Sequence, residues 1–224
     1  MLLFCRFDFC TEFLKRVDGD PNFVNKILWT DESGFTLDGY GNVQQIRYWS
    51  KRNPNFCVES MIKSKTLHIW AGISSNGIIG PFFFERTITA EAYLDILQNK
   101  MLPQLQNLSN SQDIYFMQDG AGPHYALTVR NYLNNQFPER WIGRGGPIEW
   151  PARSPDLTPM DFSVWSLIKN RCYIAKPTTM DDLKRVITDE FSRINAGYCI
   201  RTCNHVIKRY KKCILMGGAQ VPNA

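Results

Sequence analysis

Two short apolar runs, each followed closely by an aspartate, most strongly limit how this chain can fold. Residues Ile27–Thr30 form the first run, directly before Asp31, and residues Ile114–Met117 form the second, shortly before Asp119. Runs of this length and composition are typical of buried strands. If the two strands are neighbours in one sheet, their C-terminal ends bring both carboxylates to the edge where open α/β sheets bind ligands.

The rest of the chain alternates between strand and helix patterns. Strands are predicted over about 26–30, 66–73, 78–84, 113–117 and 148–150, and a glycine- and aromatic-rich stretch up to Trp49 predicts a hairpin or twisted strand pair. Helices are predicted after Thr89, around 129–137, and over about 159–173, 179–194 and 199–215. This order predicts an α/β protein with a mixed sheet and flanking helices on both faces.

One domain fits the length of 224 residues, with no internal repeat or clear linker. We divide it into an incomplete N-terminal lead-in helix (1–25), a core (26–175), C-terminal helices packed on that core (176–216) and a tail (217–224). Apolar residues make up 44% and charged residues 21%, which argues against a fibrous or disordered chain. No apolar stretch is long enough to cross a bilayer, so we expect no membrane partner.

The net charge of +5 is unevenly distributed. No acidic residue follows Glu190, whereas six basic residues do, so the first 190 residues are nearly neutral and the C-terminal part is basic. Such a basic segment is a weak indication of a polyanionic partner.

A third acid, Asp161, follows Pro159 near the start of a predicted helix, where it can lean over the same sheet edge. Carboxylate oxygens suit Mg²⁺, and three such groups can hold two ions about 3.5–4 Å apart for phosphoryl transfer. Ordinary explanations also fit, because an Asp after a strand often bonds its own backbone, and Thr158 with Asp161 fits a capping box. Asp156 competes for the third position, although its place in a loop favours a role in organising the turn before the helix.

Three sequence blocks carry a resemblance to a known family. They are Trp29-Thr-Asp-Glu-Ser33, Gln118-Asp-Gly-Ala-Gly-Pro-His124 and Trp150-Pro-Ala-Arg-Ser-Pro-Asp-Leu-Thr-Pro-Met-Asp161. In content and order they resemble the catalytic blocks of the Tc1/mariner transposases, over about residues 9–216. The 41 residues between Asp119 and Asp161 resemble the interval of a mariner-like branch.

The resemblance implies a ribonuclease-H-like (DDE/D) catalytic core over 26–175. It implies that Asp31, Asp119 and Asp161 are the catalytic residues and the ligands of two Mg²⁺ ions, for which Mn²⁺ can substitute. It also implies DNA nicking by water, followed by attack of a DNA 3′-hydroxyl on a target phosphate. DNA is the implied partner, the nucleus is the implied location, and a homodimer on paired DNA ends is one expected assembly.

Family members carry paired helix-turn-helix modules that read the transposon ends, and the thirty residues before Asp31 leave no room for them in this sequence. We therefore expect a truncated or repurposed transposase that is unable to mobilise an element alone. The alternative is a catalytically silent remnant that binds nucleic acid or another partner through its basic C-terminal helix.

Two arginines and a histidine lie near these blocks. Arg144 and Arg153 are candidates for contacts with DNA phosphates, although both fit equally well as solvated surface residues. His124, five residues after Asp119, either approaches the scissile phosphate or supports the loop as a neutral imidazole; we favour the supporting role.

The last predicted helix has a basic face formed by Arg201, His205, Lys208 and Lys212. Such a face can follow a phosphate backbone, or it can simply be the solvated outer face of the helix. In the context of the family resemblance we favour DNA contact.

Overall fold

The computed structural model describes residues 2–37, 65–108 and 111–222, and its centre is a five-stranded sheet. The strands are β1 (Ile27–Phe35), β2 (Leu67–Ser74), β3 (Gly77–Phe83), β4 (Tyr115–Met117) and β5 (Trp141–Ile142). Their spatial order is β3-β2-β1-β4-β5, with antiparallel pairing from β3 to β1 and parallel pairing from β1 to β5. This mixed sheet confirms the predicted α/β class.

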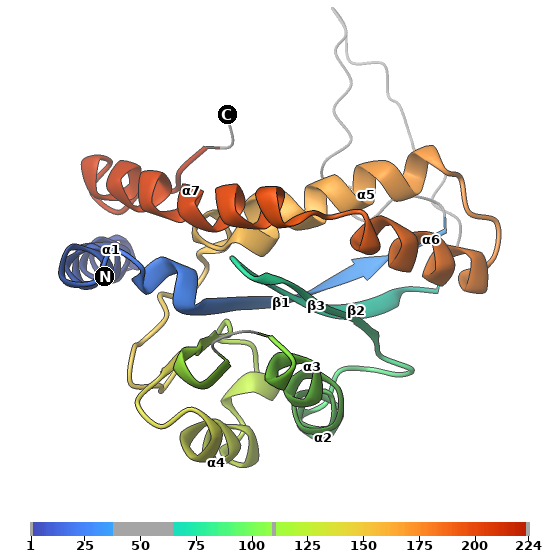
Figure 1. Ribbon diagram of the computed structural model, residues 1–224, viewed down its shortest axis with the longest axis horizontal. Helices are drawn as coiled ribbons and strands as arrows, with labels where there is room; N and C mark the ends of the chain where they lie inside the picture. The colour runs from blue at the N-terminus through green and yellow to red at the C-terminus, as the bar shows by residue number, and fades with distance from the viewer. Residues whose placement is uncertain (1, 38–64, 109–110, 223–224) are drawn as a thin grey trace, which may run out of the picture.

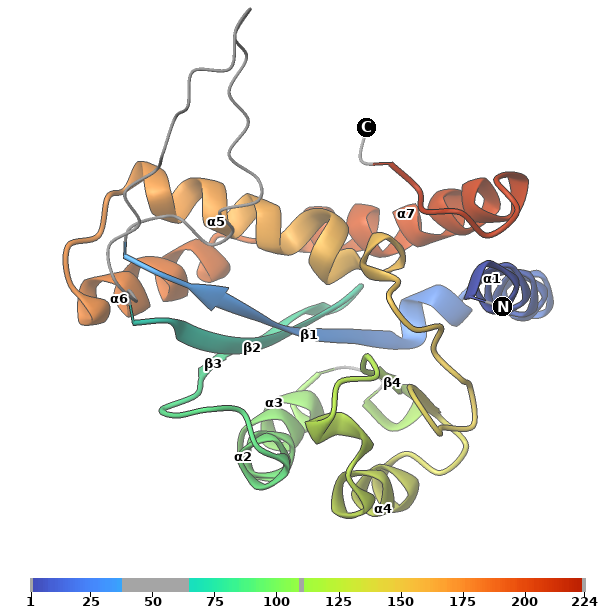
Figure 2. The ribbon, with the colours of Figure 1, turned by 180° about the vertical axis from the view of Figure 1, so that it is seen from behind.

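Helices cover both faces of the sheet (Figure 1). The first layer contains α1 (Leu2–Gly19), α5 (Trp165–Ile174), α6 (Met180–Ser192) and α7 (Ala196–Leu215). The second layer contains α2 (Ala90–Asp95), α3 (Leu102–Gln106) and α4 (Leu127–Gln136), as the view from behind also shows (Figure 2). Two π-helical segments, Ile96–Met101 and Met160–Val164, connect α2 to α3 and lead into α5. Among the described helices, none has both the length and the apolar character needed to cross a membrane.

Each face of the sheet has its own hydrophobic core, because successive strand residues point to opposite faces. In β1, Ile27 and Trp29 pack into the core under α5, α6 and α7, whereas Leu28 packs into the core with α2, α3 and α4. Trp70 of β2 also belongs to the second core, where its ring stacks on Phe82. A sheet buried on both faces explains why its strands have nearly continuous apolar sequences.

Strand β1 is longer than the sequence pattern predicts. Its parallel pairing with β4 stops at Trp29, but its antiparallel pairing with β2 extends from Trp29 to Phe35. Asp31 therefore lies inside a strand rather than after one. The position is still the edge of the parallel part of the sheet, because β4 ends at Met117.

The other predicted elements agree with the structure, with two exceptions. The strand predicted over 148–150 is only a single bridge between Ile142 and Ile148, and the two-residue strand β5 was not predicted. The hairpin predicted up to Trp49 lies mostly outside the described residues. Thr89 caps α2 as expected, since its side chain accepts a hydrogen bond from a backbone N–H of the first turn.

A side-chain hydrogen bond joins the two strands that lead to the first two acids. Thr30 is buried, and its hydroxyl donates to the carbonyl oxygen of Met117 at 2.6 Å. The bond lies one residue beyond the last parallel pair, Trp29 with Met117. It therefore fixes the distance between the chain at Asp31 and the chain leading to Asp119.

Replacing this hydroxyl tests its contribution. We expect Thr30→Val to lower the free energy of unfolding by about 1–2 kcal/mol, because the buried carbonyl of Met117 loses its donor. Urea denaturation measures the change. Thr188→Val is the matched control: its hydroxyl donates to the Lys184 carbonyl on an exposed face of α6, and we expect a change below about 0.5 kcal/mol. Equal losses in the two variants would contradict the role given to Thr30.

Candidate active site

The three predicted acids line one cavity of about 340 Å³ at the edge of the sheet. Asp31 comes from β1, Asp119 from the loop after β4, and Asp161 from the helical segment Met160–Val164 before α5. Arg153 lines the same cavity and has a φ of 55°, a left-handed conformation that is uncommon for a residue with a side chain. The structure thus brings together residues from four separate segments.

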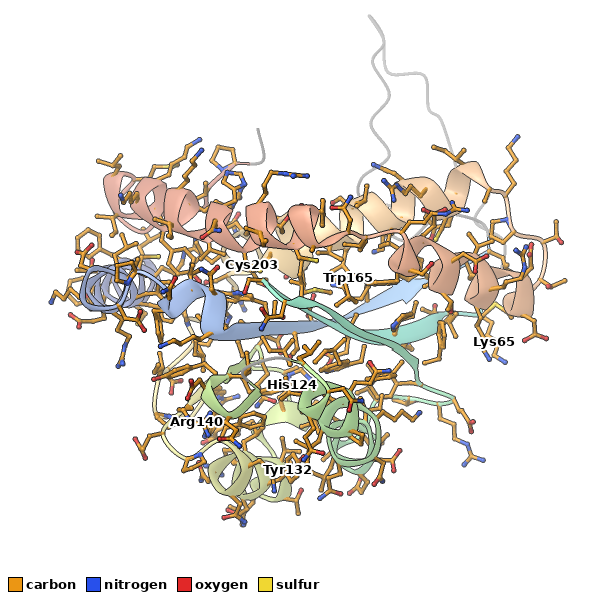
Figure 3. The ribbon with its side chains drawn as sticks, viewed as in Figure 1. Lys65, His124, Tyr132, Arg140, Trp165 and Cys203 are labelled. Carbon is orange, nitrogen blue, oxygen red and sulfur yellow. The ribbon has the colours of Figure 1, made fainter. Side chains whose placement is uncertain are left out.

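Asp31 and Glu32 are successive residues of β1, so their side chains point to opposite faces of the sheet. Asp31 Oδ2 accepts a hydrogen bond from the indole Nε1 of Trp165 at 2.8 Å. Glu32 Oε2 lies 3.1 Å from His124 Nε2. Trp165 lies on the side of α5 and His124 on the opposite side of the sheet (Figure 3). These two acids therefore have partners on opposite sides of the sheet.

His124 lies between two carboxylates. Its Nδ1 is 2.6 Å from Asp119 Oδ1, opposite its contact with Glu32. Burial alone would lower the pKa of His124, but the charge of Glu32 and the contact with Asp119 raise it to about 10. The prediction of a neutral imidazole is therefore wrong, because two carboxylates stabilise the cation at neutral pH. Burial would raise the pKa of Asp119, but the hydrogen bond from His124 brings it below its usual value.

The other two acids have raised pKa values. Burial, and then the charge of Asp161, raise the pKa of Asp31 well above its usual range. Burial raises the pKa of Asp161 to about 7, with the charge of Asp119 adding to the effect, although a hydrogen bond with Asp31 and the charge of Lys169 oppose it. Acidic groups are thus concentrated in the cavity, and such perturbed pKa values are common at functional sites.

As their side chains stand, no group of three His, Cys, Asp or Glu residues in the described part of the chain is placed to hold a metal ion. Asp119 is engaged by His124 and by the backbone N–H of Ala121, 2.9 Å from its Oδ1. The donor chemistry nevertheless fits a hard divalent cation, because three carboxylates line one cavity and two of them have pKa values raised by burial and by neighbouring acids.

Asp156, the rival for the third position, does not line this cavity. Its carboxylate accepts two hydrogen bonds from the buried Arg6 of α1, at 2.9 and 2.6 Å, and one from the backbone N–H of Val221. Its carbonyl oxygen accepts a hydrogen bond from Arg209 of α7 at 2.6 Å. The turn before Asp161 is therefore anchored to the first helix, the last helix and the C-terminal tail.

The remaining predicted DNA contacts lie outside the catalytic cavity. Arg144 is exposed and lines a neighbouring cavity of about 700 Å³. Arg201, Lys208 and Lys212 are exposed on α7. Lys208 and Lys212 line a third cavity of about 190 Å³ that also includes Phe162, the residue after Asp161.

Four contributions were missed from the sequence. They are the indole hydrogen bond of Trp165 to Asp31, the Glu32 contact with His124, the position of Lys169 near the acids, and the two arginines that hold Asp156. Glu32 was missed because the predicted strand ends at Thr30, whereas in the structure Glu32 belongs to β1 and points to the face opposite Asp31.

A mixed sheet between two helix layers, with carboxylates at the end of its parallel part, defines a ribonuclease-H-like catalytic domain. Residues 26–184 match the family described as DDE superfamily endonuclease. The chain belongs to this family, and it is a Tc1/mariner-like DDE catalytic domain.

Curated relatives support this assignment. The chain is 25% identical over 189 residues to the transposable element Tc3 transposase of Caenorhabditis elegans, covering 81% of this chain and 54% of that protein. It is 30% identical over 158 residues to the Tcb1 transposase of Caenorhabditis briggsae, covering 68% and 54%. The chain thus spans about half the length of these relatives.

Solved structures share the fold. The Mos1 transposase catalytic domain, determined with raltegravir and Mn, superposes with a TM-score of 0.75 at 19% identity, covering 98% of this chain and 96% of that chain. A pre-cleavage Mos1 transpososome superposes with a TM-score of 0.76 at 20% identity, covering 99% and 64%. At this identity the likeness establishes the fold alone.

The raised pKa of Asp161 predicts how stability depends on pH without divalent cations. The folded state holds this proton up to about pH 7, whereas the ordinary value is 3.8. The contribution of the protonated Asp161 to the free energy of unfolding is therefore complete below about pH 4. It is lost as the pH rises through 7. We expect Asp161→Asn to be more stable than the wild type at pH 8, by on the order of 4 kcal/mol, and nearly equal at pH 4. Thermal unfolding in a chelator measures this, and a difference independent of pH would contradict it.

The contact of Arg6 with Asp156 predicts a large loss on substitution. In Asp156→Asn the buried Arg6 guanidinium loses its compensating charge, and we expect about 3 kcal/mol lower stability in urea denaturation. Glu12→Gln is the control, because it changes an acid of α1 in an exposed pair with Lys15 and should cost less than about 1 kcal/mol. If Asp156→Asn costs no more than Glu12→Gln, the anchoring role fails.

Proposed function

We propose that this chain acts as the catalytic domain of a transposase, which nicks DNA and joins a DNA 3′ end to a target phosphate. The observation that carries the proposal is that Asp31, Asp119 and Asp161, from three separate segments, line one cavity. Membership of the endonuclease family and likeness to named transposases support it. We place this activity in the nucleus. By analogy with the Mos1 paired-end complex, the proposed assembly is a homodimer that holds two DNA ends.

Divalent metal ions are part of the proposal. The catalytic domain of Mos1 was determined with Mn and with Mg, and we propose that Asp31, Asp119 and Asp161 hold two Mg²⁺ ions or their Mn²⁺ substitutes. When bound, these ions would favour deprotonation of the attacking oxygen and neutralise charge on the phosphate.

The protein's own side chains position the acids and receive the substrate. Trp165 orients Asp31 through its indole N–H, and His124 holds Asp119 by an ion pair. Lys169 contributes a positive charge that is felt by Asp31 and Asp161. Arg153 lines the cavity beside the acids, where its planar guanidinium suits a phosphate of the bound strand.

The basic face of α7 extends the proposed DNA contact. Arg201, Lys208 and Lys212 are exposed and can neutralise backbone phosphates without reading the base sequence. In the transposase proposal, DNA binding at this face accompanies catalysis. In the alternative, a silent remnant, the chain binds DNA at this face without cutting it.

Nicking of a supercoiled plasmid tests the proposal directly. We expect the purified chain to nick it with Mg²⁺ or Mn²⁺ and not with a chelator. Asp119→Asn should reduce the rate at least about 100-fold, because the carboxylate charge that holds the ions is removed. Gel electrophoresis of the open-circular product measures the rate.

Two outcomes would decide against the proposal. Nicking that survives in purified Asp119→Asn would mean that the acids are not responsible. If the wild type binds DNA without any nicking, and Lys208→Glu with Lys212→Glu abolishes that binding, the silent remnant is the better description.

A further inference from the structure

Two arginines contact the ring of an exposed tyrosine beside the candidate active site. The guanidinium carbon of Arg130 lies 4.4 Å from the ring centroid of Tyr125, and that of Arg144 lies 4.1 Å from it. Tyr125 directly follows His124, Arg130 belongs to α4, and Arg144 follows β5. We call Arg130, Tyr125 and Arg144 the arginine–tyrosine stack.

Local backbone features hold the stack in place. The Nε of Arg130 donates to the carbonyl oxygen of Tyr125 at 3.1 Å, which fixes its guanidinium against the ring. Gly145 has a φ of 73°, and a Cβ there would lie 3.1 Å from the Tyr125 ring. A glycine is therefore required for the chain to turn so closely around the stack.

The two positive charges are not neutralised within the described residues. No ion pair joins Arg130 or Arg144 to a carboxylate in that part of the chain. The nearby carboxylate of Glu149 accepts instead from the backbone N–H of Gly145, at 2.8 Å. Two like charges on one ring repel each other, and an anion bound between their outward N–H edges would relieve that repulsion.

Arg144 connects the stack to the surroundings of the three acids. A Cβ on Gly120, the residue after Asp119, would lie 3.4 Å from the side chain of Arg144. Arg144 and Gly120 both line the cavity of about 700 Å³, which shares Gly120, Trp150 and Ala152 with the cavity of the three acids. An anion held by the stack would therefore sit next to a substrate in the catalytic cavity.

We propose that the arginine–tyrosine stack binds backbone phosphates of the DNA strand next to the phosphodiester that is cut. Two guanidinium groups lie over the Tyr125 ring, and no carboxylate of the described residues pairs with them, so the stack suits an anion. In DNA that anion is the phosphodiester. The ring orients the two guanidinium groups, and these groups make the contact with the phosphate. This inference rests on the proposed function only in taking DNA as the source of the phosphates.

The test measures binding of a labelled 30-base-pair duplex by fluorescence anisotropy over a range of NaCl concentrations, with a chelator so that no cutting is needed. Arg130→Met with Arg144→Met should weaken binding at least tenfold. It should also reduce the slope of log K against log[salt] by about 1.8, since each lost phosphate contact removes about 0.9. The control removes two other exposed charges, Arg86→Met with Lys100→Met, and should leave the slope unchanged.

A second pair of variants tests the orienting role of the ring. Tyr125→Ala keeps both charges but should weaken binding about fivefold, because the guanidinium groups lose their platform. Tyr125→Phe keeps the ring and should restore the binding. All variants should retain the thermal midpoint of the wild type, because the stack lies at the surface.

The inference is overturned if the double arginine variant matches the control variant in both affinity and slope. It is also overturned if the wild type binds inorganic phosphate more tightly than the double variant does, at equal ionic strength, while the two proteins bind DNA equally well. The stack would then be a site for free anions. Failure of the proposed function looks different: the wild type would not nick DNA with metal, yet the salt slopes would still differ.

Discussion

The candidate site depends on where the parallel pairing of β1 with β4 stops. The last pair is Trp29 with Met117, and the Thr30 hydroxyl closes the junction by donating to the Met117 carbonyl. Beyond this point β1 continues along β2, so Asp31 is held by a regular ladder of hydrogen bonds. The chain after Met117 leaves the sheet, and Asp119 is held instead by its own turn and by His124. Asp31 is thus positioned by the sheet, whereas Asp119 is positioned by the loop that follows β4.

Local sequence signals were enough for most elements and for the meeting of the three acids in one cavity, but not for the partners of these acids. Apolar runs and helical spacing depend on a few neighbouring residues, which is why β2, β3 and the later helices were predicted correctly. The end of β1 was misjudged, because Asp31 and the polar residues after it remain in the sheet through pairing with β2. The contacts of Trp165 with Asp31 and of Arg6 with Asp156 join residues 134 and 150 positions apart, and no local pattern encodes such pairs.

The charge distribution has a structural explanation. The acids are concentrated at one sheet edge, where burial and mutual repulsion raise the pKa values of Asp31 and Asp161. Positive groups surround that edge: His124 and Lys169 face the acids, and Arg153 lines their cavity. Such an arrangement costs folding free energy in the absence of a ligand, which is common where a site is organised for binding rather than for stability. The net charge of +5 describes none of this, because opposite charges separated in space cancel in the sum.

The buried contact of Arg6 with Asp156 matters more for geometry than for net stability. A buried ion pair contributes about as much to the free energy of unfolding as apolar residues of the same size would, so stability alone does not explain its presence. This pair is fully hydrogen-bonded, since Arg6 also donates to the carbonyl oxygens of Gly218 and Ala219. Together with the hydrogen bond from Arg209 to the Asp156 carbonyl, it ties the turn before Asp161 to two helices and the tail, so that turn cannot shift freely. Displacements of about 1 Å can cost 100-fold in rate at a catalytic site, so a rigid anchor behind the third acid serves the chemistry even where it adds little stability.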